Sequence, residues 1–168
     1  MKVHEVLDAA KPDDARKMLL RCCGAKRWAD SMEARRPFGS DEALFKTADE
    51  LWARMKPADV REALAHHPRI GASMDELKKK YGSTAAWAAG EQSGAQSADE
   101  ATLLALRDGN AAYEERFGYV FVVCATGKSA AEMLAILESR LKNDADTEIA
   151  VAAAEQGKIL RIRLEKLA

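Results

Sequence analysis

Apolar residues recur every three or four positions along much of this chain, which is the spacing of an amphipathic helix. The clearest run holds Leu44, Ala48, Leu51, Trp52 and Met55, which would share one face of a helix. Only four prolines occur in 168 residues, so long helices are not interrupted. The pattern therefore predicts a mainly helical protein.

Capping residues and helix breakers mark where these helices begin and end. Pro12 and Ser40 stand at helix starts, where a first-turn proline and a hydroxyl cap are favoured. The sequences SADE (97–100) and SAAE (129–132) match capping boxes. Gly118 is expected to end the helix that SADE opens. These signals divide the chain into several consecutive helices.

Segment 119–126, YVFVVCAT, has the β-branched and aromatic composition of a strand. No partner strand is evident elsewhere, so we expect an extended buried connection instead. Residues 83–96 are rich in small side chains and are predicted to be helical, and a last long helix is expected from about Thr147 to Leu167. We predict an all-α, single-domain compact bundle of about eight to ten helices over residues 1–168.

The last predicted helix places one arginine on its apolar face. Arg163 falls within the stripe, whereas Arg161 falls outside it. A guanidinium on a core face needs an acceptor, so Arg163 either forms a structural salt bridge or binds a substrate carboxylate. The stripe consists of Ile149, Ala153, Leu160, Leu164 and Leu167, widened by Ile159 and Ile162.

The stretch AHHPRIGAS (65–73) is the clearest candidate for chemistry. A helix that starts at Pro57 must end near His67, because the residue before Pro68 is disfavoured in the helical region. Histidine gives and takes protons near neutral pH, which points to acid–base chemistry or to a metal. Neighbouring histidines point in different directions, and His66 and His67 have no partners at metal-ligand spacing. We therefore predict no metal site.

Charge and cysteine content narrow the possible partners and the compartment. The formal net charge of −1 gives no long-range attraction to nucleic acid or to anionic membranes. No apolar run approaches the roughly 20 residues that cross a bilayer. The three cysteines, Cys22, Cys23 and Cys124, form no CxxC pair. We expect reduced thiols in a cytoplasmic protein.

Glu91 and Gln92 form a second polar pair, in the sequence GEQSG. Glu91 follows Trp87 by one helical turn, so the two would share a face. A solvated surface pair is one interpretation, and a binding pair is the other. From the residues alone, the chain is a compact helical domain with one His-Pro loop, one inward arginine and one Glu-Gln pair.

These three features, in this order, resemble the 2-oxo-4-hydroxy-4-carboxy-5-ureidoimidazoline (OHCU) decarboxylases, which form (S)-allantoin in urate degradation. The resemblance runs from about Cys22 to Leu167 and includes Trp28. It is carried by RPF (36–38), AHHPRIG (65–71), EQSGA (91–95), NAAYEERFGYVFVV (110–123), and the closing segments ESRLKN and KILRIRLEKL. Any one block is weak, but their order is specific.

The resemblance implies an enzyme that uses neither a metal nor an organic cofactor. The catalytic residues it implies are His67, as general acid/base, and Glu91. Ala88 stands where many relatives carry a serine, so one hydroxyl contact to the substrate would be missing. The substrate-binding residues it implies are Pro68, Gln92, Phe121, Val122, Val123 and Arg163, with Arg161 as the alternative arginine.

The family resemblance also implies a homodimer. A different function remains compatible with the composition and helix pattern, namely a non-catalytic helical module that binds other proteins. In that case Arg163 and Glu91 would be structural, and the His-Pro loop would only end a helix. The order of the blocks favours the enzyme.

Overall fold

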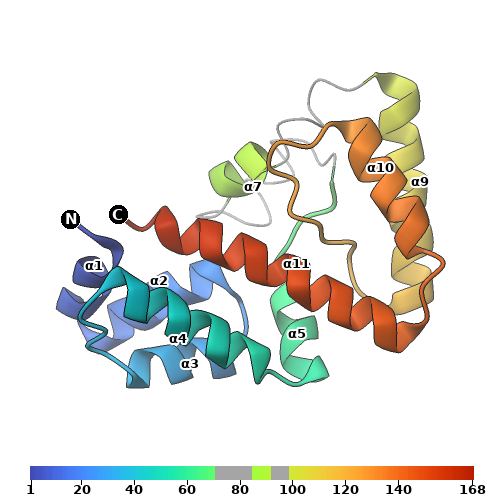
Figure 1. Cartoon of the computed structure of the whole chain (residues 1–168). Helices are drawn as coiled ribbons and strands as arrows, with labels where there is room; N and C mark the ends of the chain where they lie inside the picture. The colour runs from blue at the N-terminus through green and yellow to red at the C-terminus, as the bar shows by residue number, and fades with distance from the viewer. Residues whose placement is uncertain (71–84, 92–98) are drawn as a thin grey trace. The chain divides into compact units, whose positions relative to one another are not determined.

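The computed structural model of this chain describes residues 1–70, 85–91 and 99–168. Within these residues every regular element is a helix, and nine helices are present (Figure 1). The all-α class and the predicted number of helices are therefore confirmed for the described part of the chain. The helices are α1 (Val3–Ala9), α2 (Pro12–Cys22), α3 (Lys26–Ala34), α4 (Asp41–Ala53), α5 (Pro57–Leu64), α7 (Ala85–Glu91), α9 (Glu100–Phe117), α10 (Ala130–Arg140) and α11 (Ala145–Glu165).

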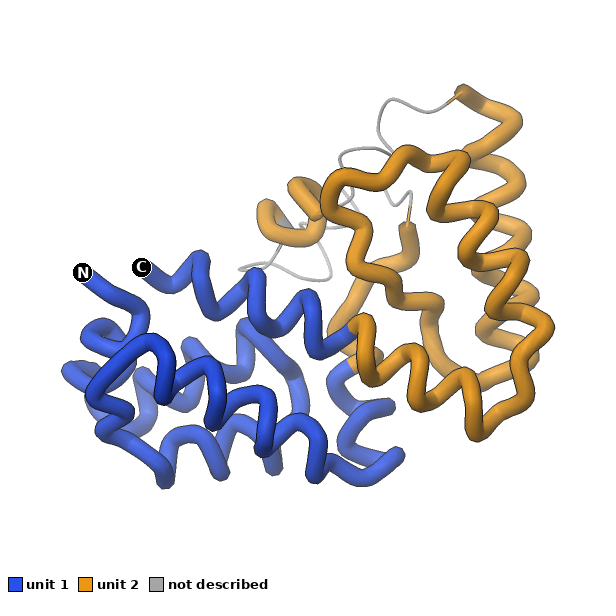
Figure 2. The backbone as a smooth tube through the Cα atoms, viewed as in Figure 1, with its two compact units in different colours: residues 1–63, 156–168 blue, residues 64–155 orange. Residues whose placement is uncertain are grey.

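The chain divides into two compact units. Unit 1 comprises residues 1–63 and 156–168, and unit 2 comprises residues 64–155 (Figure 2). Both boundaries fall within helices, because α5 and α11 each contribute residues to both units. The expectation of a single domain over residues 1–168 stays a prediction.

Unit 1 is built on the apolar faces of its first helices. α2 lies beside α3, and α3 lies beside α4 (Figure 1). The Trp28 indole on α3 is fully buried, and its Nε1 donates to the carbonyl of Ala48 on α4 at 3.3 Å. Leu44, Ala48, Leu51 and Trp52 are all buried. The spacing of apolar residues in this segment thus identified one wall of the core.

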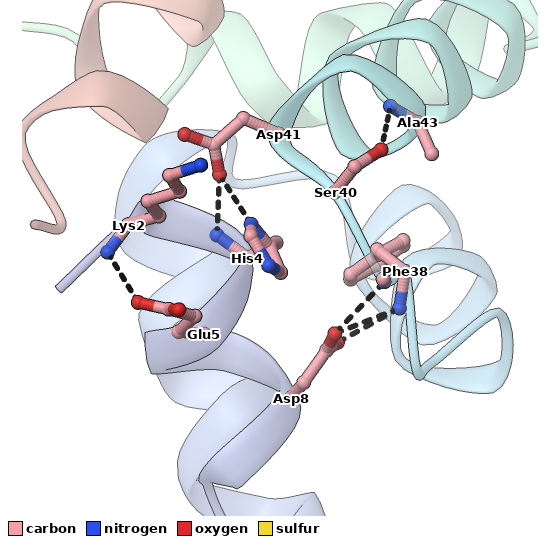
Figure 3. Close-up of polar contacts among 9 residues, drawn as sticks. Lys2, His4, Glu5, Asp8, Phe38, Ser40, Asp41 and Ala43 are labelled. Atoms are coloured by element: carbon pink, nitrogen blue, oxygen red, sulfur yellow. Dashed lines mark hydrogen bonds and ion pairs between the residues drawn. The ribbon is translucent and has the colours of Figure 1, made fainter.

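Polar side chains fasten the segment between α3 and α4 to α1 (Figure 3). The Asp8 carboxylate accepts from the backbone N–H of Phe38 at 2.9 Å and of Gly39 at 3.0 Å. His4 donates its backbone N–H to Asp41 Oδ1 at 2.8 Å, and its ring Nδ1 lies 2.8 Å from the same oxygen. These contacts fix the point at which α4 starts relative to α1.

Three helices begin at the predicted residues. Pro12 is the first residue of α2, and the Ser40 hydroxyl accepts the Ala43 N–H at 3.0 Å at the start of α4. Ser129 and Glu132 form the predicted capping box of α10. The two serines satisfy backbone donors that a helix leaves unpaired at its first turn, and Pro12 has no such donor to satisfy.

The start of α9 corrects one prediction. α9 begins at Glu100, and its N-cap is Asp99, whose carboxylate accepts the Thr102 N–H at 2.7 Å. The capping box expected from Ser97 is therefore wrong, and Ser97 itself lies outside the described residues. A carboxylate caps a helix as well as a hydroxyl does. Its negative charge is also stabilised by the positive end of the helix dipole.

In unit 2, α9 and α10 lie side by side (Figure 1). At their contact Gly109 leaves room for Leu137, because a Cβ at position 109 would lie 2.6 Å from Leu137 Cδ2 and would force that side chain to shift. The segment that joins the two helices has no strand, as expected, and Phe121, Val122 and Val123 within it are buried.

The helix α11 is turned from its predicted phase in its first half. Glu148 and Ala152 are fully buried there, whereas Ile149 and Ala153 are only half-buried. The difference amounts to one residue, and its physical cause is the ion pair and the hydrogen bonds of Glu148 described below. In the second half, Ile159, Leu160, Arg163 and Leu164 are buried, in agreement with the predicted stripe.

Two glycine substitutions test the backbone assignment in unit 2. Gly118 ends α9 with a φ of +84°, a left-handed conformation that costs other residues about 1 kcal/mol. We expect Gly118→Ala to lower the free energy of unfolding by about that amount. Gly90 in α7 has open space at its Cβ position, so Gly90→Ala should raise it by up to about 1 kcal/mol. Urea unfolding measures the free energy of unfolding of both variants. The same change in both would contradict the left-handed conformation of Gly118 and the helical conformation of Gly90.

Candidate active site

The loop after α5 carries the His-Pro sequence. α5 ends at Leu64, earlier than predicted, and the His67 backbone N–H donates to the Leu64 carbonyl at 3.1 Å. His67 has only 7% of its surface exposed and Pro68 is also buried, whereas His66 is exposed. The two adjacent imidazoles therefore have different environments. Because the His67 ring is buried, water screens its electrostatic interactions with a ligand less than it would for His66.

Arg69 ties this loop to α9. Its Nε lies 2.8 Å from Glu114 Oε2, and its Nη2 lies 3.2 Å from Glu114 Oε1. The Arg69 side chain is mainly exposed, so this pair adds little to the free energy of unfolding. Its two-bond geometry instead restrains the direction in which the chain leaves Pro68.

Glu91 is the last residue of α7 and is half-buried. Ala88, about one turn earlier, is buried, and it stands at the position where the resemblance implies a serine. Gln92, the neighbour predicted to bind substrate with Glu91, lies outside the described residues. Only the acidic member of the predicted pair is therefore described.

Side chains hold the backbone of the predicted substrate-binding segment. The Val122 carbonyl accepts from Arg140 Nη1 at 2.7 Å, and the Cys124 N–H donates to Glu155 Oε1 at 3.1 Å. The Cys124 carbonyl accepts from Lys128 Nζ at 2.7 Å. A buried backbone needs such partners, and here side chains supply bonds that a neighbouring strand would make in a sheet.

Arg140 belongs to a buried ion pair with Glu148. Arg140 Nε donates to Glu148 Oε1 at 2.7 Å, and the Tyr113 hydroxyl donates to the same oxygen at 2.5 Å. Asn143 Nδ2 donates to the other carboxylate oxygen at 3.0 Å. Burial raises the pKa of the Tyr113 hydroxyl, and its bond to Glu148 raises this pKa further, so the hydroxyl stays a proton donor. This cluster compensates the charge of a fully buried carboxylate.

Neither member of this pair was identified from the sequence. Arg140 follows Met133 and Leu137 on the buried face of α10, so the criterion that singled out Arg163 also applies to it. Glu148 gave no such signal, since it lies beside the predicted stripe of α11. Its partners Tyr113 and Arg140 belong to other helices, and periodicity within one helix cannot reveal them.

Arg163 and Arg161 lie on different sides of α11, as predicted. Arg163 is only 3% exposed, and its Nη1 donates to the Arg21 carbonyl at 3.1 Å. The Arg161 guanidinium lies 3.9 Å from the centroid of the Phe45 ring and pairs with Glu165 at 3.3 Å. Arg161 is exposed. The buried guanidinium is the better candidate for ligand binding, because fewer water molecules compete for it.

The predicted site residues divide between the two units. His67, Pro68, Glu91 and the segment 121–123 belong to unit 2, and Arg163 belongs to unit 1. Binding of one substrate by all of them stays a prediction. The described residues contain no group of three or more His, Cys, Asp or Glu side chains that could hold a metal ion. No helix among them has the length and apolar composition needed to cross a membrane.

Comparison with known proteins finds one family along almost the entire chain. The profile of the OHCU decarboxylase family matches residues 8–165. A 2-oxo-4-hydroxy-4-carboxy-5-ureidoimidazoline decarboxylase from Amia calva is 31% identical over 134 residues, which cover 79% of this chain and 74% of that protein. A uric acid degradation bifunctional protein from Arabidopsis thaliana is 34% identical over 148 residues. That match covers 87% of this chain, which spans only 45% of the Arabidopsis protein.

A solved structure shares the fold. The crystal structure of an OHCU decarboxylase in the presence of (S)-allantoin matches with a TM-score of 0.75 and 27% identity. The match covers 94% of this chain and 98% of the other, so it includes sequence from both units.

The two buried thiols next to Arg163 lead to a prediction about reactivity. Burial raises the pKa of Cys22 and Cys23 to about 12, although the Arg163 charge acts in the opposite direction. At pH 8 only about one such thiol in 10,000 is ionised, and the thiolate is the reactive form. We expect an aromatic disulfide reagent to modify one thiol of the folded protein quickly, the half-buried Cys124, and all three in denaturant. Cys124→Ser should abolish the fast reaction, and fast modification of two thiols in that variant would refute the prediction.

Proposed function

The chain belongs to the OHCU decarboxylase family, and on this basis we propose that it converts OHCU to (S)-allantoin and CO2 in urate degradation. The observation that carries the proposal is the family match over residues 8–165. The burial of His67 supports it, since a proton donor that controls stereochemistry must be shielded from bulk water.

The proposed reaction can proceed with side chains alone. The bond between the ring carbon and its carboxylate breaks, and its electron pair passes into the adjacent imine, whose nitrogen takes up a proton, leaving an enol and CO2. A proton then adds to the carbon that bears the ureido group, and the enol hydroxyl loses its proton as the carbonyl forms. One proton is taken up overall per carboxylate consumed. Water would protonate both faces of the enol, so the enzyme's task is to deliver the proton to one face.

Each predicted site residue has a role in this scheme. We propose His67 as the proton donor and acceptor, with Glu91 as its acidic partner. Arg163 would bind the substrate carboxylate, and its planar guanidinium suits that group. The remaining substrate contacts are proposed for Pro68, Gln92, Phe121, Val122 and Val123. No resident metal or organic cofactor takes part in the proposed scheme.

We further propose that the protein is a homodimer in the cytoplasm and binds no nucleic acid. The family resemblance supports the dimer, and the three free cysteines suit a reducing compartment. The net charge of −1 gives no attraction to nucleic acid. Sedimentation equilibrium would contradict the dimer if the purified 18.4 kDa chain sediments as a monomer.

His67 provides the test of the proposed activity. OHCU is generated in place from urate by the two preceding enzymes, and allantoin formation and its enantiomeric excess are followed. We expect the wild-type chain to give (S)-allantoin, and His67→Asn to lower kcat/KM by about 100- to 10,000-fold and yield racemic product. His66→Asn is the matched control, because His66 is exposed. A wild-type chain that leaves the rate and enantiomeric excess at their uncatalysed values would refute the proposal, and inactivity of His66→Asn alone would refute the choice of histidine.

The two arginines of α11 give a second test. Loss of a charged hydrogen bond in a shielded site costs roughly 2–4 kcal/mol, so Arg163→Ala should lower kcat/KM by about 30- to 1,000-fold. Arg163→Lys should also be impaired, because lysine keeps the charge but lacks the planar fork. Arg161→Ala should stay near wild type. Melting temperatures are measured alongside, and an Arg163→Ala variant that melts lower but keeps full activity would show a purely structural arginine.

A further inference from the structure

The peptide geometry around Val123 follows from the bonds to its two neighbours. In a trans peptide the carbonyl of one residue and the N–H of the next point in opposite directions. The Val122 carbonyl points to Arg140, so the Val123 N–H points away from Arg140. The Cys124 N–H points to Glu155, so the Val123 carbonyl points away from Glu155. The side chains that hold the segment thereby set the directions of the backbone donor and acceptor of Val123.

Arg140 is suited to hold this geometry, because its one guanidinium contacts Glu148, Tyr113 and the Val122 carbonyl at the same time. Nε and Nη2 both bind Glu148 Oε1, at 2.7 and 2.5 Å, Nη1 binds the Val122 carbonyl, and Nη2 also lies 3.3 Å from the Tyr113 hydroxyl. Its Cζ lies 4.6 Å from the centroid of the Phe121 ring, a cation–π distance. These hydrogen bonds lie in fixed directions, so the Val122 carbonyl cannot rotate without breaking the cluster.

We propose that Arg140 is a positioning residue for substrate binding, acting through the peptide between Val122 and Val123. It does not touch the substrate. By holding the Val122 carbonyl it presents the Val123 N–H to the substrate in one orientation. This inference rests on the proposed function, in which Phe121, Val122 and Val123 bind OHCU. Tyr113 and Glu148 share the role, because they fix the plane of the guanidinium.

The decisive variant is Arg140→Lys, which keeps a cation beside Glu148 but cannot make these directed bonds. We expect KM for OHCU to rise at least 10-fold and the enantiomeric excess to fall, with a smaller change in kcat. A contact that binds the ground state and the transition state equally affects KM rather than kcat. The matched control is Arg36→Lys. The Arg36 guanidinium also holds backbone carbonyls, those of Leu7 at 2.6 Å and Ala10 at 2.7 Å in unit 1, and this variant should leave KM and enantiomeric excess unchanged.

Tyr113→Phe keeps the test decisive if Arg140→Lys does not fold. The substitution retains the buried ring and removes only the hydroxyl that donates to Glu148 and accepts from Arg140. We expect KM to rise about threefold and the enantiomeric excess to fall. Kinetics are measured well below the melting temperature of each variant, so that loss of folded protein does not contribute.

The outcomes separate this inference from the proposed function. If the wild-type chain gives only racemic allantoin at the uncatalysed rate, the proposed function fails, and the role of Arg140 fails with it. If the wild-type chain is active but Arg140→Lys melts lower with unchanged KM and enantiomeric excess, Arg140 is structural and this inference alone is wrong. Where Arg140→Lys does not fold, unchanged values in Tyr113→Phe would overturn the inference in the same way.

Discussion

Unit 2 depends on the charge pair between Arg140 and Glu148. The carboxylate is fully buried, and leaving either charge without its partner in such a place costs about 3–5 kcal/mol. The pair joins α10 to α11, Tyr113 brings in α9, and the Val122 carbonyl brings in the connecting segment. Such a pair adds little net stability over apolar packing. Its directed bonds form, however, only when α9, α10, α11 and the connecting segment have this arrangement.

Unit 1 is held together differently. Fully buried apolar side chains such as Trp28 and Met32 fill its interior. The polar contacts of Asp8 and of His4 with Asp41 lie at helix ends and are partly open to solvent. Apolar packing tolerates small shifts of one helix against another, whereas the cluster around Glu148 does not. The directional contacts of unit 2 therefore coincide with the segment proposed to need fixed geometry.

The sequence predicted those features that residues close together in the chain determine. The buried face of α4 repeats every turn, and the same reasoning separated Arg163 from Arg161. It failed at Asp99 because SADE contains two residues that cap well, and only packing selects between them. Glu148 could not be predicted as buried, since its partners Arg140 and Tyr113 belong to other helices, and the pattern within α11 does not show that they lie beside it. The residues around His67 in the sequence do not show that it is buried while His66 is exposed. The roles of the site residues came from the family resemblance and not from the residue pattern. Periodicity reports which face of an element is buried, and it does not report what lies opposite that face.

The division of unit 1 into two stretches affects the order of folding. Residues 64–155 form unit 2 as one continuous stretch, whereas unit 1 needs both residues 1–63 and residues 156–168. The contact between Arg21 and Arg163 spans 142 positions. At about 5–20 residues per second, the ribosome needs roughly 5–18 s to make the 92 residues (155 − 63) in between. During that time α1 to α4 lack the apolar side chains of Ile159, Leu160 and Leu164. The unit synthesised first is thus completed last, and its uncovered helices are the part of the nascent chain that most needs protection from aggregation.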